Sequence, residues 1–206
     1  MREVAPGLWL DAERGVVEFA GRISPMIAGG VHGRNRFLLE QFVCLAGTKD
    51  HESLVVTDVQ PSAIHAALLA AGAEPGRPAT WVTEDRVIRM VAPTGAAVRV
   101  EFVMADGAAI DPRVWVADAE SGAPMPPGEG GWVFAGSTVK SSRGSEFYEA
   151  DAAGTIVGLA GFGSETIAWT EAISDQEEAG ELRWVAGAYS MAHPEAAVRV
   201  RVLINR

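Results

Sequence analysis

Short apolar runs, each bounded by Gly, Pro or Asp, are the feature of this sequence that most limits its fold. Runs such as Val16–Ala20 and Leu54–Val59 are shorter than a typical core helix and end at turn-forming residues. In Ala97–Met104 and Val198–Ile204, apolar residues alternate with polar ones, which is typical of strands with one buried face. Many short strands at this spacing predict a largely antiparallel sheet in a sandwich or open barrel.

One segment, 61–72, has the pattern of a helix. Pro61 suits a first helical turn, where its missing N–H costs nothing. Apolar residues recur with helical spacing on one face, and Gly72 favours a left-handed stop. We therefore expect one β-rich α+β domain over residues 1–206, with its main helix packed on the sheet.

Composition excludes several classes of protein. The net charge of −10 and the absence of a Lys/Arg cluster argue against a nucleic-acid partner. The single cysteine, Cys44, cannot form an internal disulfide or hold an iron–sulfur cluster. No run approaches the roughly 18 apolar residues of a membrane span. The start of the chain has no signal-peptide pattern, which favours the cytoplasm, or export if an upstream leader was removed.

The densest group of polar residues lies in Cys44–Ser53 and continues to Asp58 and His65. If Gly47 forms a hairpin turn, Cys44 pairs across from His51 or from Ser53, and thiol and imidazole come close in either register. A nearby cation raises the thiolate fraction of a cysteine. This arrangement would make a hydrolase-type site of Cys44, His51 and Glu52.

Two other interpretations compete with this site. In a regular strand over Lys49–Val59, His51 and Glu52 would point to opposite faces, and Cys44 could be a small buried hydrophobe. A divalent metal held by His51, Glu52, Asp58 and His65 is also possible by ligand type. Their spacing matches no recurring ligand motif, so no metal or other cofactor is expected.

Several segments of the chain resemble the YdjY-like domain family of bacterial proteins, common in planctomycetes and often exported. The likeness rests on Val43–Gly76, Gly130–Ser137, Tyr148–Leu159 and the final strand. The residues that match the family pattern are Lys49, His51, Glu52, Asp58, Ile64, His65, Trp132, Gly136, Ser137 and Asp151. The resemblance implies no defined reaction. A ferredoxin-type label that sometimes accompanies the family conflicts with the single cysteine.

These observations favour a non-enzymatic binding or accessory module for a small molecule or a protein. The candidate binding residues are Lys49, Asp58, His65, Trp132, Ser137 and Asp151. Taken alone, Asp151 reads as the residue that fixes an acidic turn over 148–154. If Val198–Ile204 is an exposed edge strand, it would be a natural seam for a homodimer.

Overall fold

A nearly closed barrel forms the centre of the molecule. The computed structural model describes residues 1–27, 37–84, 87–126, 130–142, 144–174 and 183–205. Within them, the main sheet has 11 strands. The strands follow one another around the barrel in the order β16 (Thr155–Gly158), β4 (Gln41–Leu45), β5 (Ser53–Thr57), β3 (Val16–Ile23), β19 (Ala197–Ile204), β10 (Ala97–Val103), β13 (Trp132–Val133) and β17 (Ala168–Trp169).

The two ends of this strand order meet. Val157 of β16 pairs with Ile167, which lies just before β17. The N–H of Ile167 also donates to the carbonyl of Ile156 at 2.8 Å. This contact brings the first and last strands of the order together, and the predicted β-rich fold with an open-barrel sheet is confirmed.

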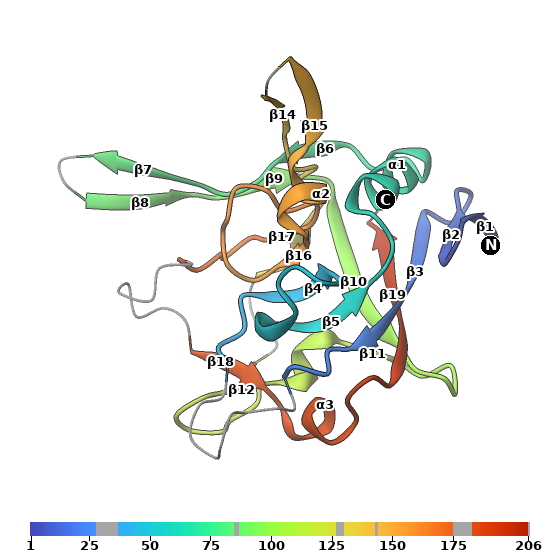
Figure 1. Ribbon diagram of the computed structural model, residues 1–206, viewed down its shortest axis with the longest axis vertical. Coiled ribbons are helices and arrows are strands. Elements are labelled where there is room, and N and C mark those ends of the chain that lie inside the picture. The colour runs from blue at the N-terminus through green and yellow to red at the C-terminus, as the bar shows by residue number, and fades with distance from the viewer. Residues whose placement is uncertain (28–36, 85–86, 127–129, 143, 175–182, 206) are drawn as a thin grey trace.

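Shorter strand pairs surround the barrel. β1 (Arg2–Ala5) and β2 (Leu8–Asp11) extend the sheet beside β3, and β11 (Ala109–Ile110) pairs with β10. Separate two-stranded sheets join β6 (Pro75–Arg77) to β9 (Thr94–Gly95), β7 (Thr80–Glu84) to β8 (Val87–Val91), β12 (Val116–Asp118) to β18 (Trp184–Ala186), and β14 (Val139–Ser142) to β15 (Ser145–Tyr148). The β7–β8 and β14–β15 hairpins project away from the barrel (Figure 1).

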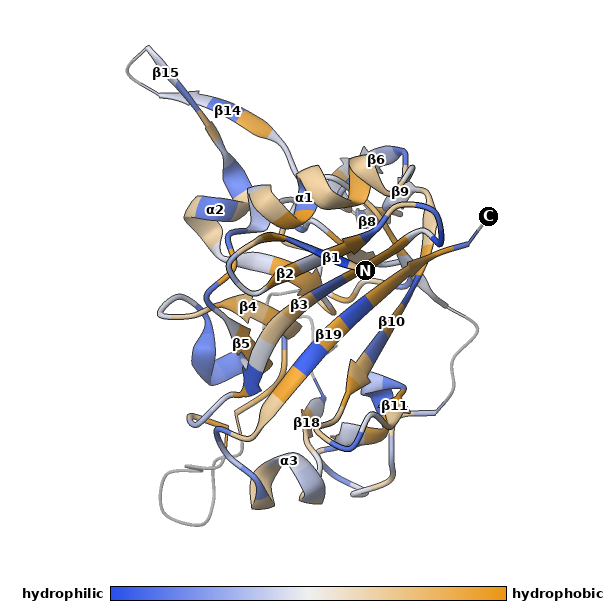
Figure 2. Ribbon diagram, turned by 90° about the vertical axis from the view of Figure 1, so that its right-hand side faces the viewer, coloured by the Kyte–Doolittle hydropathy of each residue, from blue (hydrophilic) through white to orange (hydrophobic). Residues whose placement is uncertain are grey.

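The main helix, α1 (Pro61–Ala70), is two residues shorter than the predicted 61–72. Gly72 adopts a left-handed φ of +92°, and its N–H donates to Leu69 while that of Ala73 donates to Leu68. These two bonds satisfy carbonyls that the helix leaves free, so the predicted glycine stop is confirmed. The other helical segments are α2 (Glu149–Ala153), α3 (Ala188–Ala192), and the 3₁₀ turns η1 (Asp50–Glu52) and η2 (Pro112–Trp115). α1 and α3 lie at opposite ends of the barrel (Figure 2).

The alternation read in the sequence determines which side of β19 faces the core. Val198, Val200 and Val202 are buried, whereas Arg199 is exposed on the outer face. Figure 2 shows the same alternation of apolar and polar residues along β19. However, β19 is not an edge strand, because β3 pairs with it on one side and β10 on the other. The predicted dimer seam at 198–204 is therefore wrong, since most of this strand's main chain already has neighbours.

The predicted hairpin at Gly47 is also wrong. Gly47 does lie in a turn with a φ of +82°, but β4 and β5 run parallel. The connection between them folds back through η1, where the Asp50 carboxylate accepts the N–H groups of Gly47 and Thr48. As a result, Cys44 pairs with Val56 rather than with His51 or Ser53.

Candidate functional site

Cys44 lies in the protein core. Its side chain is fully buried, and its Sγ is 3.9 Å from Oδ1 of Asp50. Burial, with a smaller contribution from the Asp50 charge, raises the pKa of this thiol to about 11. The thiolate is the nucleophilic form of cysteine, so this environment opposes nucleophilic chemistry at neutral pH.

Lys49, His51 and Glu52 form a surface group of their own. The Nζ of Lys49 lies 2.5 Å from Oε1 of Glu52 and 4.1 Å from the ring centre of Phe162. The Nε2 of His51 is 3.4 Å from Oε2 of Glu52. The 3₁₀ turn η1 brings His51 and Glu52 together, where a regular strand would have separated them. The side chain of His51 is 47% exposed, in contrast to the buried Cys44.

His65, on α1, belongs to a different polar network. Its Nδ1 lies 3.0 Å from the hydroxyl of Tyr148, and that hydroxyl donates to the Gly136 carbonyl at 3.1 Å. Burial lowers the pKa of His65 and raises the pKa of Tyr148 to about 12. Both side chains are therefore held in their neutral forms at neutral pH, and they join α1 to the segments around Gly136 and β15.

Ser137 and Asp151 stabilise helix starts. Oδ1 of Asp151 accepts the N–H of Ser62, in the first turn of α1, at 2.8 Å. Oγ of Ser137 accepts the N–H of Ala150, in the first turn of α2, at 3.2 Å. Such bonds satisfy N–H groups that a helix leaves free. The segment expected as an acidic turn is thus the short helix α2, and Asp151 acts on α1 rather than on its own turn.

The four candidate metal ligands do not converge. Asp58 pairs with Arg22 at 3.1 Å, His65 with Tyr148, and His51 with Glu52. Among the residues that the structure describes, no group of three or more His, Cys, Asp and Glu side chains has a geometry suited to a metal ion.

Trp132 faces the barrel interior. Its ring centroid is 4.8 Å from that of Trp169 and 5.5 Å from that of Phe42. The guanidinium carbon of Arg113 lies 5.7 Å from both indole centroids, and Asp111 accepts from Nε of Arg113 at 3.0 Å. Within the described chain, Nε1 of Trp132 and Nη1 of Arg113 are buried without a hydrogen-bond partner. Trp132 therefore lies in a closed aromatic cluster and is only 4% exposed.

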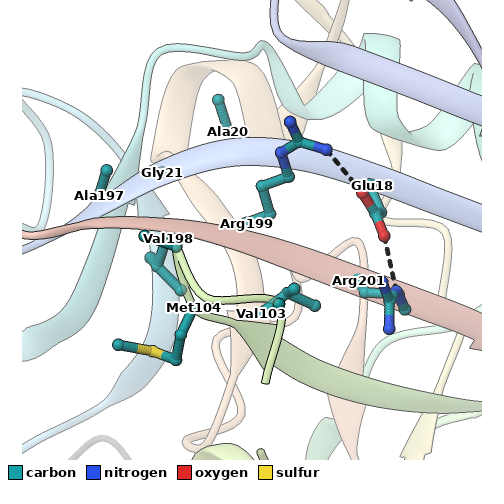
Figure 3. A pocket seen from close by; sticks show the side chains of 11 residues that line it. Glu18, Ala20, Gly21, Val103, Met104, Ala197, Val198, Arg199 and Arg201 are labelled. Atoms are coloured by element: carbon teal, nitrogen blue, oxygen red, sulfur yellow. Dashed lines mark hydrogen bonds and ion pairs between the residues drawn. The ribbon is translucent and has the colours of Figure 1, made fainter. Parts of the chain in front are cut away.

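A hollow on the protein surface, which the sequence analysis did not predict, contains charged side chains. At the end of β10, a hollow of about 490 Å³ opens over β3 and β19, lined by Glu18, Ala197, Val198, Arg199, Arg201 and neighbouring residues that include Met104 and Ala105 (Figure 3). We call it the arginine hollow. In Figure 3, Arg199 and Arg201 reach toward Glu18 from either side. Glu18 is 3% exposed, and its carboxylate contacts Arg201 at 2.6 Å and Arg199 at 3.4 Å.

A second hollow adjoins the first. It measures about 630 Å³ and shares Met104 and Ala105 with the arginine hollow. The remaining lining residues are Asp106, Ile110, Val114, Trp115 and Tyr189. Val114 is 59% exposed and Tyr189 is 40% exposed. The Tyr189 ring stacks on the Trp115 ring, with 4.9 Å between the ring centroids. We call this the apolar hollow, and the two together the sheet-end groove.

The alternation of β19 places Arg199 and Arg201 on one face, but the sequence offers no sign that Glu18 lies between them. That contact depends on the register of β3 against β19, which joins positions 183 residues apart. Likewise, the apolar hollow combines η2 with α3, and neither 3₁₀ turns nor short helices have a strong sequence pattern.

Comparison with models of protein families gives a match over most of the chain. The model of the YdjY domain matches residues 8–205, which is nearly the whole chain. No curated protein and no solved structure matches. In the described part of the chain, no helix has both the length and the apolar character needed to cross a membrane. The family match extends from β2 to the end of β19, and on it the chain belongs to the YdjY domain family.

Proposed function

We propose that this chain is a non-enzymatic binding module, an accessory protein that holds a ligand or partner in the sheet-end groove. One observation carries the proposal. The exposed guanidinium group of Arg199 and the partly buried one of Arg201 adjoin an apolar hollow on the same surface. Arginine and aromatic side chains are enriched in binding surfaces, and a groove with both offers charge recognition and apolar burial together.

The residues of the groove belong to parts of the fold that are well supported by strand pairing and by the core. Arg199 and Arg201 belong to a strand paired on both sides over Arg199–Leu203, and Trp115 is a buried core residue. Such support keeps a binding surface in one geometry, which lowers the entropy cost of association. By contrast, the candidate catalytic residues Cys44 and His51 differ in exposure and contacts, and their surroundings give less support to an enzyme.

Titration with 1-anilinonaphthalene-8-sulfonate tests the proposal, because this fluorescent probe has an anionic group attached to aromatic rings. We expect saturable binding to the native protein at neutral pH. Arg199→Gln and Val114→Asp should each weaken it about fivefold or more, equivalent to about 1 kcal/mol.

Two matched variants serve as controls. Arg14 is 82% exposed and Val139 is 65% exposed, and neither lines the groove. Arg14→Gln and Val139→Asp should leave the dissociation constant unchanged. Circular dichroism should confirm that all four variants are folded. If the groove variants bind the probe as tightly as the controls, the groove is not a binding surface and the proposal is wrong.

A further inference from the structure

Building on the proposed function, we infer that the occupant of the sheet-end groove is an extended segment of a partner protein. This segment has an acidic residue close to an aromatic or branched apolar residue. The inference rests on a free strand edge, on the unequal roles of two arginines, and on the exposed side chains of the apolar hollow.

The arginine hollow contains a free edge of β19. β19 pairs with β3 from Ala197 onward but with β10 only from Arg199 onward. In the described chain, Ala197 and Val198 therefore have a strand on one side only. The Ala196 carbonyl accepts the N–H of Ile23 at 2.9 Å, so the main chain of Ala196 faces β3. Because these groups alternate along a strand, those of Ala197 face the hollow and can pair with an extended peptide.

The two arginines differ in how firmly they are engaged. Nε of Arg201 lies 2.6 Å from the buried Glu18 carboxylate, and its Nη1 lies 3.4 Å from Glu101. Arg199 reaches Glu18 only at 3.4 Å and is 55% exposed, with its guanidinium carbon 4.6 Å from the ring centre of Trp9. Glu18 is thus held mainly by Arg201, and Arg199 presents an oriented cation to a carboxylate from outside.

The apolar hollow suits a neighbouring side chain of the same segment. Val114 and Tyr189 are its exposed apolar members. Asp106 is the acidic residue that lines it, and its Oδ1 accepts the N–H of Ala108 at 2.9 Å. This bond directs the carboxylate to its own turn. The Tyr189 ring already stacks on Trp115 and His193, so an aromatic or branched side chain from a partner would cover Val114 and pack against the edge of Tyr189, which removes apolar area from water.

A polypeptide fits this groove better than a fatty acid does. Both hollows open to solvent at the end of the sheet, whereas sites for apolar small molecules usually enclose most of the ligand. A fatty acid also has no N–H or carbonyl group with which to continue the strand edge at Ala197.

Selection from a displayed library of random ten-residue peptides tests the inference. We expect the peptides enriched on the native protein to contain Asp or Glu near an aromatic or branched apolar residue. For synthetic copies, replacing the acid by its amide should weaken binding about tenfold, as should Arg199→Gln. Val114→Asp should also weaken binding, whereas Arg14→Gln should have no effect.

Ala197→Pro tests the strand edge directly. It removes the N–H that faces the hollow, and proline is tolerated at the first residue of a strand. We expect at least about fivefold weaker peptide binding and no loss of binding of the sulfonate probe. If Ala197→Pro does not fold, Arg199→Gln and the amide peptides still decide the question.

Three results would overturn the inference. The enriched peptides could lack an acid, they could bind the groove variants as well as the native protein, or no peptide could bind while dodecanoate displaces the fluorescent probe. In the last case the groove is a small-molecule site and the binding-module proposal stands. If the probe itself is insensitive to the groove variants, the proposed function fails as well.

Discussion

Glu18 and Arg201 face each other across β3 and β19, with 2.6 Å between Oε1 and Nε, and Glu18 is almost completely buried. A buried carboxylate depends on its partners, because burying a charge without them is costly. Glu18→Gln keeps the shape of the side chain but leaves Arg201 without its closest anion. Since Arg201 is 29% exposed, water compensates in part, and we expect a loss of about 1–2 kcal/mol in the free energy of unfolding.

Urea denaturation measures this loss. Glu3→Gln is the matched control, because Glu3 is exposed and contacts the N–H of Gly7 on its own turn. The control should change stability by less than about 0.5 kcal/mol. Equal effects of the two substitutions would show that the buried pair does not stabilise the fold.

The Cys44 thiol should be unreactive in the folded protein. With a pKa of about 11 instead of 9.0, its thiolate fraction at pH 8 is about 100-fold lower than that of a free cysteine, and burial also blocks access. Reaction with 5,5′-dithiobis(2-nitrobenzoate) should therefore be slow in buffer and stoichiometric in guanidinium chloride. Labelling of the native protein at the rate of the unfolded chain would contradict the buried position and revive the nucleophile hypothesis.

Stability should fall as the pH is lowered through the range in which His65 titrates. Burial lowers the pKa of His65 in the folded protein below the ordinary value of 6.5, so the unfolded chain takes up the proton first. The stabilisation is present above pH 6.5 and is lost progressively below it, as the pH falls through the lowered pKa. Comparing urea midpoints at pH 7.5 and 5.5 measures the effect.

One substitution assigns this pH dependence. His65→Gln should reduce the difference between the two midpoints. If the difference between the midpoints is the same in His65→Gln as in the native protein, His65 is not the source of the pH dependence.

Asp151 should stabilise α1 although it lies 89 residues away in the chain. Asp151→Ala removes the acceptor for the Ser62 N–H and should cost about 1 kcal/mol. Asp151→Asn keeps an acceptor and should cost less. The exposed Asp58 provides the comparison, since Asp58→Ala should have a smaller effect in the same urea experiment. If Asp58→Ala is the more destabilising substitution, the hydrogen bond from Ser62 to Asp151 does not stabilise α1.

Local patterns in the sequence predicted the local structure well. The alternation in Val198–Ile204 and Ala97–Met104 matches β19 and β10, and Pro61 and Gly72 mark the start and stop of α1. Each of these signals depends on residues a few positions apart. The same locality explains the errors, because pairing partners and sheet order depend on contacts between distant residues.

The polar segment after Cys44 shows this limit. From the sequence, Gly47 indicated a hairpin, but the side chain of Asp50 bonds to the loop main chain and η1 turns the chain back, so β5 runs parallel to β4. Residues close in sequence were thereby separated: Cys44 entered the core and His51 the surface. The sheet-end groove was not predicted for the opposite reason, since Glu18, Arg199 and Arg201 become neighbours only through the register of the folded sheet.

The central position of β19 has a consequence for the order of folding. This strand joins β3 to β10, yet the ribosome adds it more than 90 residues after β10 and more than 170 after β3. Until it emerges, β3 and β10 present open edges, and open strand edges invite pairing with other chains. Closure of the sheet is therefore a late step that depends on contacts of long sequence separation, which slow folding.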